Sequence, residues 1–236
     1  MPQPVYTVLF DLDGTLLDTL GDLADAINFA MRNTGHPEKA DAEVLAAIGN
    51  GIRNAIRSSL PGQPSLTEVD AALSLFKEQY KKCYLNKTQP YPGVVEIMHA
   101  LRAKGYKIGV ISNKSDEFTA GLVSKFFSGL VDASAGERQG VPLKPAPEAV
   151  FSLISQIGGD LSHTIYVGDS EVDAATAMNA GAPCVLVSWG FRGRGTLLQA
   201  KADAEASGMP YPIRIADNAA EALEAILEIA NGHEIG

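Results

Sequence analysis

Short apolar segments rich in β-branched residues recur along this 236-residue chain, and they constrain its fold more than any other feature. They are nearly continuous rather than alternating, which is typical of strands buried on both faces of a parallel sheet. Helical patterns separate them, so we expect an α/β fold with a doubly wound, Rossmann-like parallel sheet. The predicted strands are residues 5–10, 107–111, 130–133, 164–167 and 184–187, with 212–215 as an edge strand.

The segments between these strands carry apolar stripes and terminal signals of helices. Ser170-x-x-Asp173 is a capping box that begins one helix, and Gly181 is placed to end it. Asn218-x-x-Glu221 begins the last helix in the same way. Another helix follows two prolines, and its predicted apolar stripe is Val150, Phe151 and Ile154.

One interval interrupts the alternation of strands and helices. No strand pattern follows the first strand until about residue 107, although a crossover needs only about 10–12 residues. The additional residues of this interval contain several apolar stripes with helical spacing, and one of these stripes follows the capping box Ser65-x-x-Glu68. We therefore expect a helical cap domain at residues 18–87, inserted into an α/β core of residues 1–17 and 88–236.

Composition narrows the class of protein. The chain has 19 basic and 28 acidic residues, a net charge of −9, which gives no bulk attraction to nucleic acid or to an anionic membrane. It has two cysteines and no Cys/His cluster, so a disulfide scaffold and a zinc site are not expected. No signal peptide or membrane-spanning segment is visible, and the predicted location is the cytoplasm.

Three carboxylates gather where the first predicted strand ends. Asp11, Asp13 and Asp18 fall within eight residues, and Gly14 permits an unusual backbone turn beside them. In open α/β sheets, sites form at the carboxyl ends of the strands. Because close carboxylates repel one another, they need a cation or a shared proton.

Further polar residues follow other strands. Ser112-Asn113 and Gly168-Asp169 come directly after predicted strands, and Lys144 precedes a helix. The carboxyl ends of parallel strands meet at one edge, so these side chains are expected to converge there. Carboxylates without nearby cysteine or histidine favour Mg²⁺. A lysine and a hydroxyl beside such an ion suit a transferring phosphoryl group, which an aspartate can accept.

Four motifs in order resemble those of the haloacid dehalogenase superfamily. They are DLDGTLLDT (residues 11–19), Ser112-Asn113, Lys144-Pro145 and GDSEVD (residues 168–173), and the resemblance extends over nearly the whole chain. The helical insertion is similar to the family's small cap domain. The stretch at 48–53 and the segment Trp189-Gly190-Phe191 resemble the phosphoglycolate phosphatase-like subgroup.

The resemblance implies a role for each motif. It makes Asp11 the nucleophile and Asp13 the general acid/base, and it implies that Ser112, Asn113 and Lys144 bind the phosphoryl group. It also implies Mg²⁺ held by Asp11, Asp169 and the main-chain oxygen of Asp13. A carboxylate two residues after the nucleophile, absent from the dehalogenases and phosphonatases of that superfamily, favours phosphate esters as substrates.

Other residues keep two interpretations. Asp173 is either an outer support of the metal or only a helix cap. Asn50 and Gly51 either contact substrate or only form a turn between cap helices, and Arg53 and Lys114 either contact substrate or are solvated. The sequence assigns no role to Arg192 or Arg194.

The resulting prediction is a Mg²⁺-dependent phosphoric monoester hydrolase that forms an aspartyl-phosphate intermediate. Its partner is a small phosphorylated metabolite, first of all 2-phosphoglycolate, and the chain is expected to be a monomer or a homodimer. One alternative is a sugar phosphomutase, which returns the phosphoryl group to its substrate. The other is a non-enzymatic phospho-aspartate switch domain, a fold-level analogy.

Overall fold

The computed structural model of the chain describes residues 5–232. These residues form two compact units. One comprises the chain up to Leu16 and from Pro90 onward, and the other is Leu17–Gln89. The first unit is an α/β structure and the second is helical, so the predicted insertion of helices into an α/β chain is confirmed.

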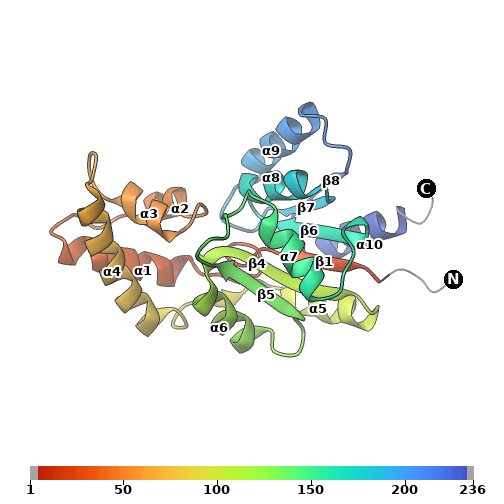
Figure 1. The fold of residues 1–236 in the computed structure, drawn as a ribbon, viewed down its shortest axis with the longest axis horizontal. Coiled ribbons are helices and arrows are strands. Elements are labelled where there is room, and N and C mark those ends of the chain that lie inside the picture. Colours follow the sequence, from red (N-terminus) through yellow and green to blue (C-terminus); the bar gives the residue numbers. More distant parts are fainter. Residues whose placement is uncertain (1–4, 233–236) are drawn as a thin grey trace. The chain divides into compact units, whose positions relative to one another are not determined.

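The α/β unit is built on a six-stranded sheet in the order β5-β4-β1-β6-β7-β8 (Figure 1). All neighbouring strands pair in parallel, and β1 lies between β4 and β6 with Thr7 opposite both Lys107 and Thr164. The predicted parallel α/β class is therefore confirmed, and β8 is an edge strand as expected. The strands are β1 (Thr7–Phe10), β4 (Lys107–Ser115), β5 (Ala133–Glu137), β6 (Thr164–Gly168), β7 (Cys184–Val187) and β8 (Ile213–Ala216).

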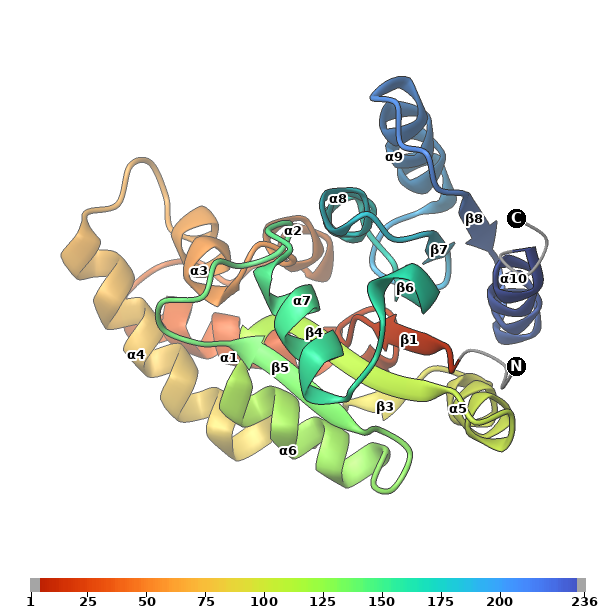
Figure 2. The same ribbon diagram turned by 45° about the vertical axis from the view of Figure 1, so that its right-hand side comes forward.

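Helices cover both faces of this sheet (Figure 1 and Figure 2). On one face α7 (Glu148–Gln156), α8 (Glu171–Ala180) and α9 (Arg194–Ala206) enclose a core that includes Leu9 and Tyr166. On the other face α5 (Val94–Ala103) and α10 (Ala219–Gly232) pack over the alternate strand side chains. The remaining helices are α6 (Asp116–Phe126), beside β4 and β5, and a 3₁₀ turn at Leu161–His163.

The helical unit contains four helices whose apolar stripes pack against one another. Ser65 and Glu68 form the predicted capping box: the Ser65 Oγ accepts from the Glu68 N–H, and Glu68 accepts from the Ser65 N–H. Phe76 and Tyr80 stack within the last helix of the unit. The elements are β2 (Leu17–Asp18), α1 (Leu20–Asn33), α2 (Asp41–Ala47), α3 (Ile52–Ser59), α4 (Leu66–Cys83) and β3 (Gln89–Pro90), with β2 and β3 paired.

Some details of the sequence interpretation are wrong. The strand expected at 130–133 begins only at Ala133, because Leu130 still belongs to a turn and donates its N–H to Phe127. Four of the five residues of the strand that follows are small, and together they give no apolar signal. Phe151 does not join the buried stripe of α7, since it is 44% exposed and Leu153 is buried instead.

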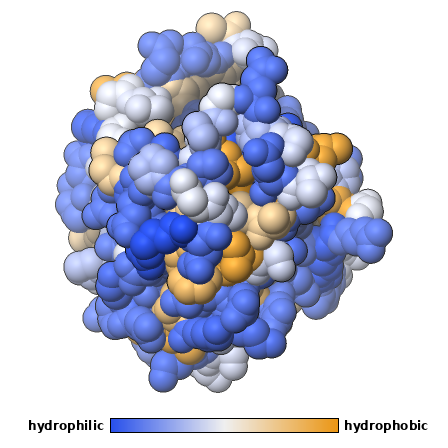
Figure 3. Space-filling view, turned by 90° about the vertical axis from the view of Figure 1, so that its left-hand side faces the viewer, coloured by the Kyte–Doolittle hydropathy of each residue, from blue (hydrophilic) through white to orange (hydrophobic). Residues whose placement is uncertain are grey.

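Hydrophilic residues cover most of the face shown in Figure 3, with small hydrophobic areas between them. Within residues 5–232, every helix is too short or too polar to cross a membrane.

Candidate active site

The carboxyl ends of the two central strands carry the two aspartates around which the site is built. Asp11 follows β1 directly and Asp169 follows β6, and both are buried. The Asp11 N–H donates to the carbonyl of Val167 at 2.8 Å, which continues the ladder between these strands. Side chains separated by more than 150 residues of sequence are thereby fixed at one edge of the sheet.

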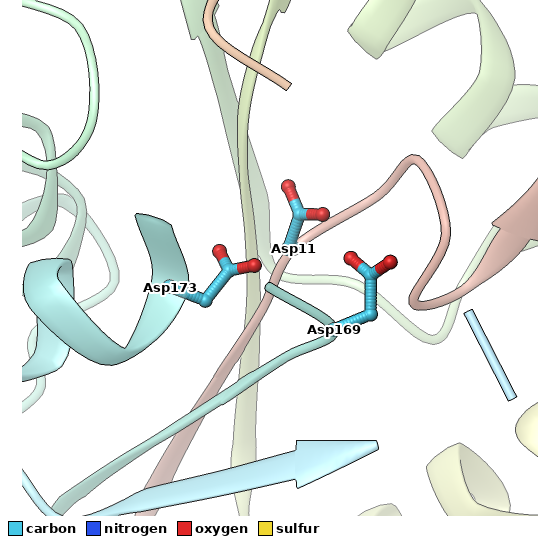
Figure 4. A group of neighbouring side chains, drawn as sticks. All are labelled: Asp11, Asp169 and Asp173. Atoms are coloured by element: carbon cyan, nitrogen blue, oxygen red, sulfur yellow. The ribbon is translucent and has the colours of Figure 1, made fainter. Parts of the chain in front are cut away.

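A third carboxylate, Asp173, reaches the same place from the first turn of α8 (Figure 4). One carboxylate oxygen from each of Asp11, Asp169 and Asp173 lies within 4.8 Å of the other two, and all three residues are buried. Asp173 also completes the predicted capping box, because its Oδ2 accepts from the Ser170 N–H at 3.1 Å. The two interpretations of Asp173 are therefore compatible.

Lys144 supplies a positive charge to this cluster. Its Nζ donates to Asp11 Oδ1 at 2.6 Å and to Asp173 Oδ1 at 2.8 Å, and its side chain is 5% exposed. The Tyr166 hydroxyl donates to the same Asp173 oxygen at 3.2 Å. Lys144, which the sequence marked by its place before a helix and by the resemblance of Lys144-Pro145 to a family motif, thus bridges two of the three carboxylates.

Burial and mutual repulsion shift the protonation of the cluster. Burial chiefly raises the pKa of Asp11 to about 7, since repulsion by Asp173 adds to it and Lys144 only partly opposes it. Burial and the charges of Asp173 and Asp11 raise the pKa of Asp169 well above 3.8. Burial would lower the pKa of Lys144, but Asp11 and Asp173 outweigh that effect and raise it well above 10.5.

The donor set fits a hard divalent cation. With all three carboxylates ionised and Lys144 protonated, two negative charges remain uncompensated in a buried cluster. Closely grouped carboxylate oxygens are ligands that Mg²⁺ takes in proteins. A divalent cation would relieve the repulsion that raises the pKa values of Asp11 and Asp169.

Ser112 and Asn113 lie inside β4, because this strand continues to Ser115 and does not end at residue 111 as predicted, and both residues are buried. The Asn113 side chain holds the loop that carries Lys144: its Oδ1 accepts from the Lys144 N–H at 2.8 Å and its Nδ2 donates to the Lys144 carbonyl at 3.1 Å. The Ser112 Oγ accepts from the Lys114 N–H at 3.2 Å.

Asp13 and Lys114 form an ion pair in the same unit. The Lys114 Nζ donates to both carboxylate oxygens of Asp13, at 2.8 and 2.9 Å. The Lys114 side chain is 6% exposed and that of Asp13 is 20% exposed. The Lys114 side chain is therefore buried and paired with a partly exposed carboxylate, and of its two predicted states the solvated one is wrong.

Residues that the sequence interpretation missed hold the carboxylates in place. The Thr15 hydroxyl lies 3.4 Å from Asp11 Oδ2 and 3.3 Å from Asp169 Oδ1, and the Phe191 N–H donates to Asp169 Oδ2 at 2.6 Å. A Cβ on Gly190 would overlap the Gly14 carbonyl and the Asp169 side chain. Thr15 belongs to the quoted DLDGT motif, so its fixed distance from Asp11 was a usable signal.

The cap residues named from the sequence lie in the helical unit. Gly51 has φ of 83° and directly precedes α3, and the Asn50 carbonyl accepts from the Asn54 side chain, so the predicted turn is present. Arg53 pairs with Asp70 at 2.7 Å and is 45% exposed. In the α/β unit, Arg192 pairs with Glu171, and Arg194 pairs with Asp217.

Comparison with known proteins agrees with the motifs. Residues 8–187 match the family described as haloacid dehalogenase-like hydrolase. The chain belongs to this family. It is 32% identical to the phosphoglycolate phosphatase of Caulobacter vibrioides over 193 residues, which covers 78% of this chain and 80% of that protein. It is 34% identical to the phosphoglycolate phosphatase of Mesorhizobium japonicum over 200 residues, covering 82% and 86%.

A solved structure gives the same picture for this haloacid dehalogenase-like hydrolase. A crystal structure from Lactobacillus delbrueckii subsp. bulgaricus, provisionally described as a phosphoglycolate phosphatase, superposes with a TM-score of 0.83. It shares 31% identity, and the match covers 95% of this chain and 99% of that one. The predicted superfamily and its phosphoglycolate phosphatase-like character are confirmed.

Proposed function

We propose that this protein is a Mg²⁺-dependent phosphatase of small phosphorylated metabolites, with 2-phosphoglycolate as its first candidate substrate. The observation that carries the proposal is the buried cluster of Asp11, Asp169 and Asp173, bridged by Lys144, at the carboxyl ends of β1 and β6. Relatives named as phosphoglycolate phosphatases at 32–34% identity support the choice of substrate.

Asp11 is proposed as the nucleophile. One of its oxygens attacks phosphorus, the bond from phosphorus to the ester oxygen breaks, and an aspartyl phosphate forms with loss of an alcohol. Lys144 holds the other oxygen of Asp11 and, with Ser112, stabilises charge on the transferring group. Asn113 contributes by fixing the backbone of Lys144 on both sides.

Asp13 is proposed as the general acid and then the general base. It gives a proton to the departing ester oxygen in the first step. It then takes a proton from water, which attacks phosphorus, breaks its bond to Asp11 and releases inorganic phosphate. Its carboxylate is partly exposed, in contrast to the buried Asp11, so water can reach it.

Mg²⁺ would be held by Asp11, Asp169 and the main-chain oxygen of Asp13, with Asp173 as an outer support. When bound, it supplies charge neutralisation that lets an anionic phosphate approach buried carboxylates. We propose residues 18–87 as the cap that selects the substrate, with Asn50, Gly51 and Arg53 as its candidate contacts. The reaction needs no nucleic acid or membrane partner.

The test is release of inorganic phosphate from a panel of phosphorylated metabolites that includes 2-phosphoglycolate, with and without Mg²⁺. We expect Asp11→Asn to lose activity by at least about a thousandfold, because the nucleophile is removed. The matched control is Glu228→Gln, which neutralises an exposed carboxylate on α10 and should retain activity.

Three outcomes would contradict the proposal. They are full activity of Asp11→Asn, full activity after exhaustive removal of divalent cations, and isomerised sugar phosphate in place of inorganic phosphate. The last result would identify a phosphomutase. A stable phosphoprotein without turnover would instead indicate a switch domain.

A further inference from the structure

Lys114 occupies an unusual place for a lysine. It lies near the end of β4, where the pairing with β5 shifts register between Ile111 and Ser115. Its side chain is 6% exposed, although lysine is among the residues least often buried. A buried ammonium requires a charged partner, and the structure gives it Asp13.

The backbone of Lys114 is held on both sides. Its N–H donates to the Ser112 Oγ at 3.2 Å, and its carbonyl accepts from the Thr119 hydroxyl at 3.3 Å. Thr119 is completely buried in the first turns of α6. Strand β4 and helix α6 thus fix the point from which the ammonium reaches Asp13.

We propose that Lys114 is a positioning residue that aims the Asp13 carboxylate at the departing ester oxygen. The proposal rests on the proposed function, because it needs Asp13 as the general acid. An aspartate with partial exposure has free rotation about its side-chain bonds unless something holds it. Contact with both carboxylate oxygens at 2.8 and 2.9 Å restricts that rotation and orients the group.

A positioning role makes a specific prediction about leaving groups. An alkyl ester leaves as an alkoxide unless the ester oxygen gains a proton from Asp13 while its bond to phosphorus breaks. A p-nitrophenyl ester leaves as a stable phenolate and needs no proton. Misdirection of Asp13 should therefore slow cleavage of the alkyl ester and spare the aryl ester.

The experiment measures kcat/KM of Lys114→Met for 2-phosphoglycolate, or for whichever alkyl phosphate the wild type hydrolyses best, and for p-nitrophenyl phosphate. This ratio covers the steps up to the departure of the leaving group and excludes the later hydrolysis of the aspartyl phosphate. We expect a loss of at least about tenfold for the alkyl ester and of less than about threefold for the aryl ester. The inhibition constant of inorganic phosphate should stay within about twofold, because Lys114 acts through Asp13.

Lys107→Met is the matched control, since it removes a lysine at the other end of β4 and should leave both ratios unchanged. If Lys114→Met does not fold, Lys114→Gln is measured in the same way, with the same pattern expected. The proposal would be overturned by equal losses of kcat/KM for both esters or by no loss for either. It would also be overturned if the inhibition constant of inorganic phosphate rose by the same factor as kcat/KM fell. A wild type that hydrolyses neither ester would contradict the proposed function itself and this role with it.

Discussion

Replacement of Asp11 by asparagine should stabilise the metal-free protein at alkaline pH while it removes activity. Burial and repulsion by Asp173 raise the pKa of Asp11 from 3.8 to about 7. The folded state therefore binds a proton more tightly than the unfolded state does. The stabilisation that comes from this proton is fully present below pH 3.8 and is lost as the pH rises through 7.

The size of the effect follows from this shift. One pKa unit corresponds to about 1.36 kcal/mol, so a pKa of about 7 in place of 3.8 gives a total loss of about 4 kcal/mol. About 3 kcal/mol of that loss falls between pH 5 and pH 8. Asparagine has nearly the same shape and does not titrate, so the variant lacks this term.

The assay is urea unfolding in the presence of a chelator, followed by the fluorescence of Trp189, the sole tryptophan of the chain. The wild type should lose about 3 kcal/mol of its free energy of unfolding between pH 5 and pH 8, and Asp11→Asn should not. The difference in free energy of unfolding between variant and wild type should therefore rise by about 3 kcal/mol over this range. Glu228→Gln should show no such gain, because Glu228 is exposed. Parallel pH curves for wild type and Asp11→Asn would refute the electrostatic reasoning.

Two further predictions concern residues outside the proposed catalytic set. Gly190→Ala should weaken Mg²⁺ binding by at least about tenfold, because its methyl group would overlap the Asp169 side chain. The measurement is the Mg²⁺ concentration needed to raise Tm. The control is Gly195→Ala, whose Cβ meets open space and which should bind Mg²⁺ as the wild type does. Asp22→Ala should lower the free energy of unfolding by about 2–4 kcal/mol in urea titrations, because the buried Asp22 carboxylate accepts from the N–H groups of Lys87 and Thr88. Asp25→Ala, which removes only an exposed ion pair with Lys87, should cost less than about 1 kcal/mol, and an equal loss in both variants would contradict the reasoning.

Sequence patterns predicted most of the fold because buried parallel strands carry a strong apolar signal. Val8 and Val185 belong to such runs, and the strands that contain them lie as expected. The strand at Ala133–Glu137 was misplaced because it lies at the edge of the sheet and consists mostly of small residues. Phe151 was misplaced because a three-residue stripe does not distinguish neighbouring positions on a helix.

The site was predictable where its residues directly follow strands. Asp11 and Asp169 meet because β1 and β6 are neighbours, and the order of polar residues after strands predicted that meeting. The pairing of Lys114 with Asp13 was not predictable, since the predicted strand ended at residue 111, whereas β4 continues to Ser115 and includes Lys114. Nor was the contact of Phe191 with Asp169, which a loop distant in sequence provides through its main chain.

The chain leaves the α/β unit after Leu16 and re-enters it at Pro90, and these two segments are hydrogen-bonded to one another. The Tyr91 N–H donates to the Leu16 carbonyl at 3.1 Å, and β2 pairs with β3, so outgoing and returning chain run together. This pairing forms a two-stranded stem, β2 with β3, and the residues between the two strands can be treated as a separate module. A shorter turn or a foreign domain could be grafted onto it without disturbing the ladder of β1, β4 and β6, so evolution can exchange the insert while it preserves the acidic cluster.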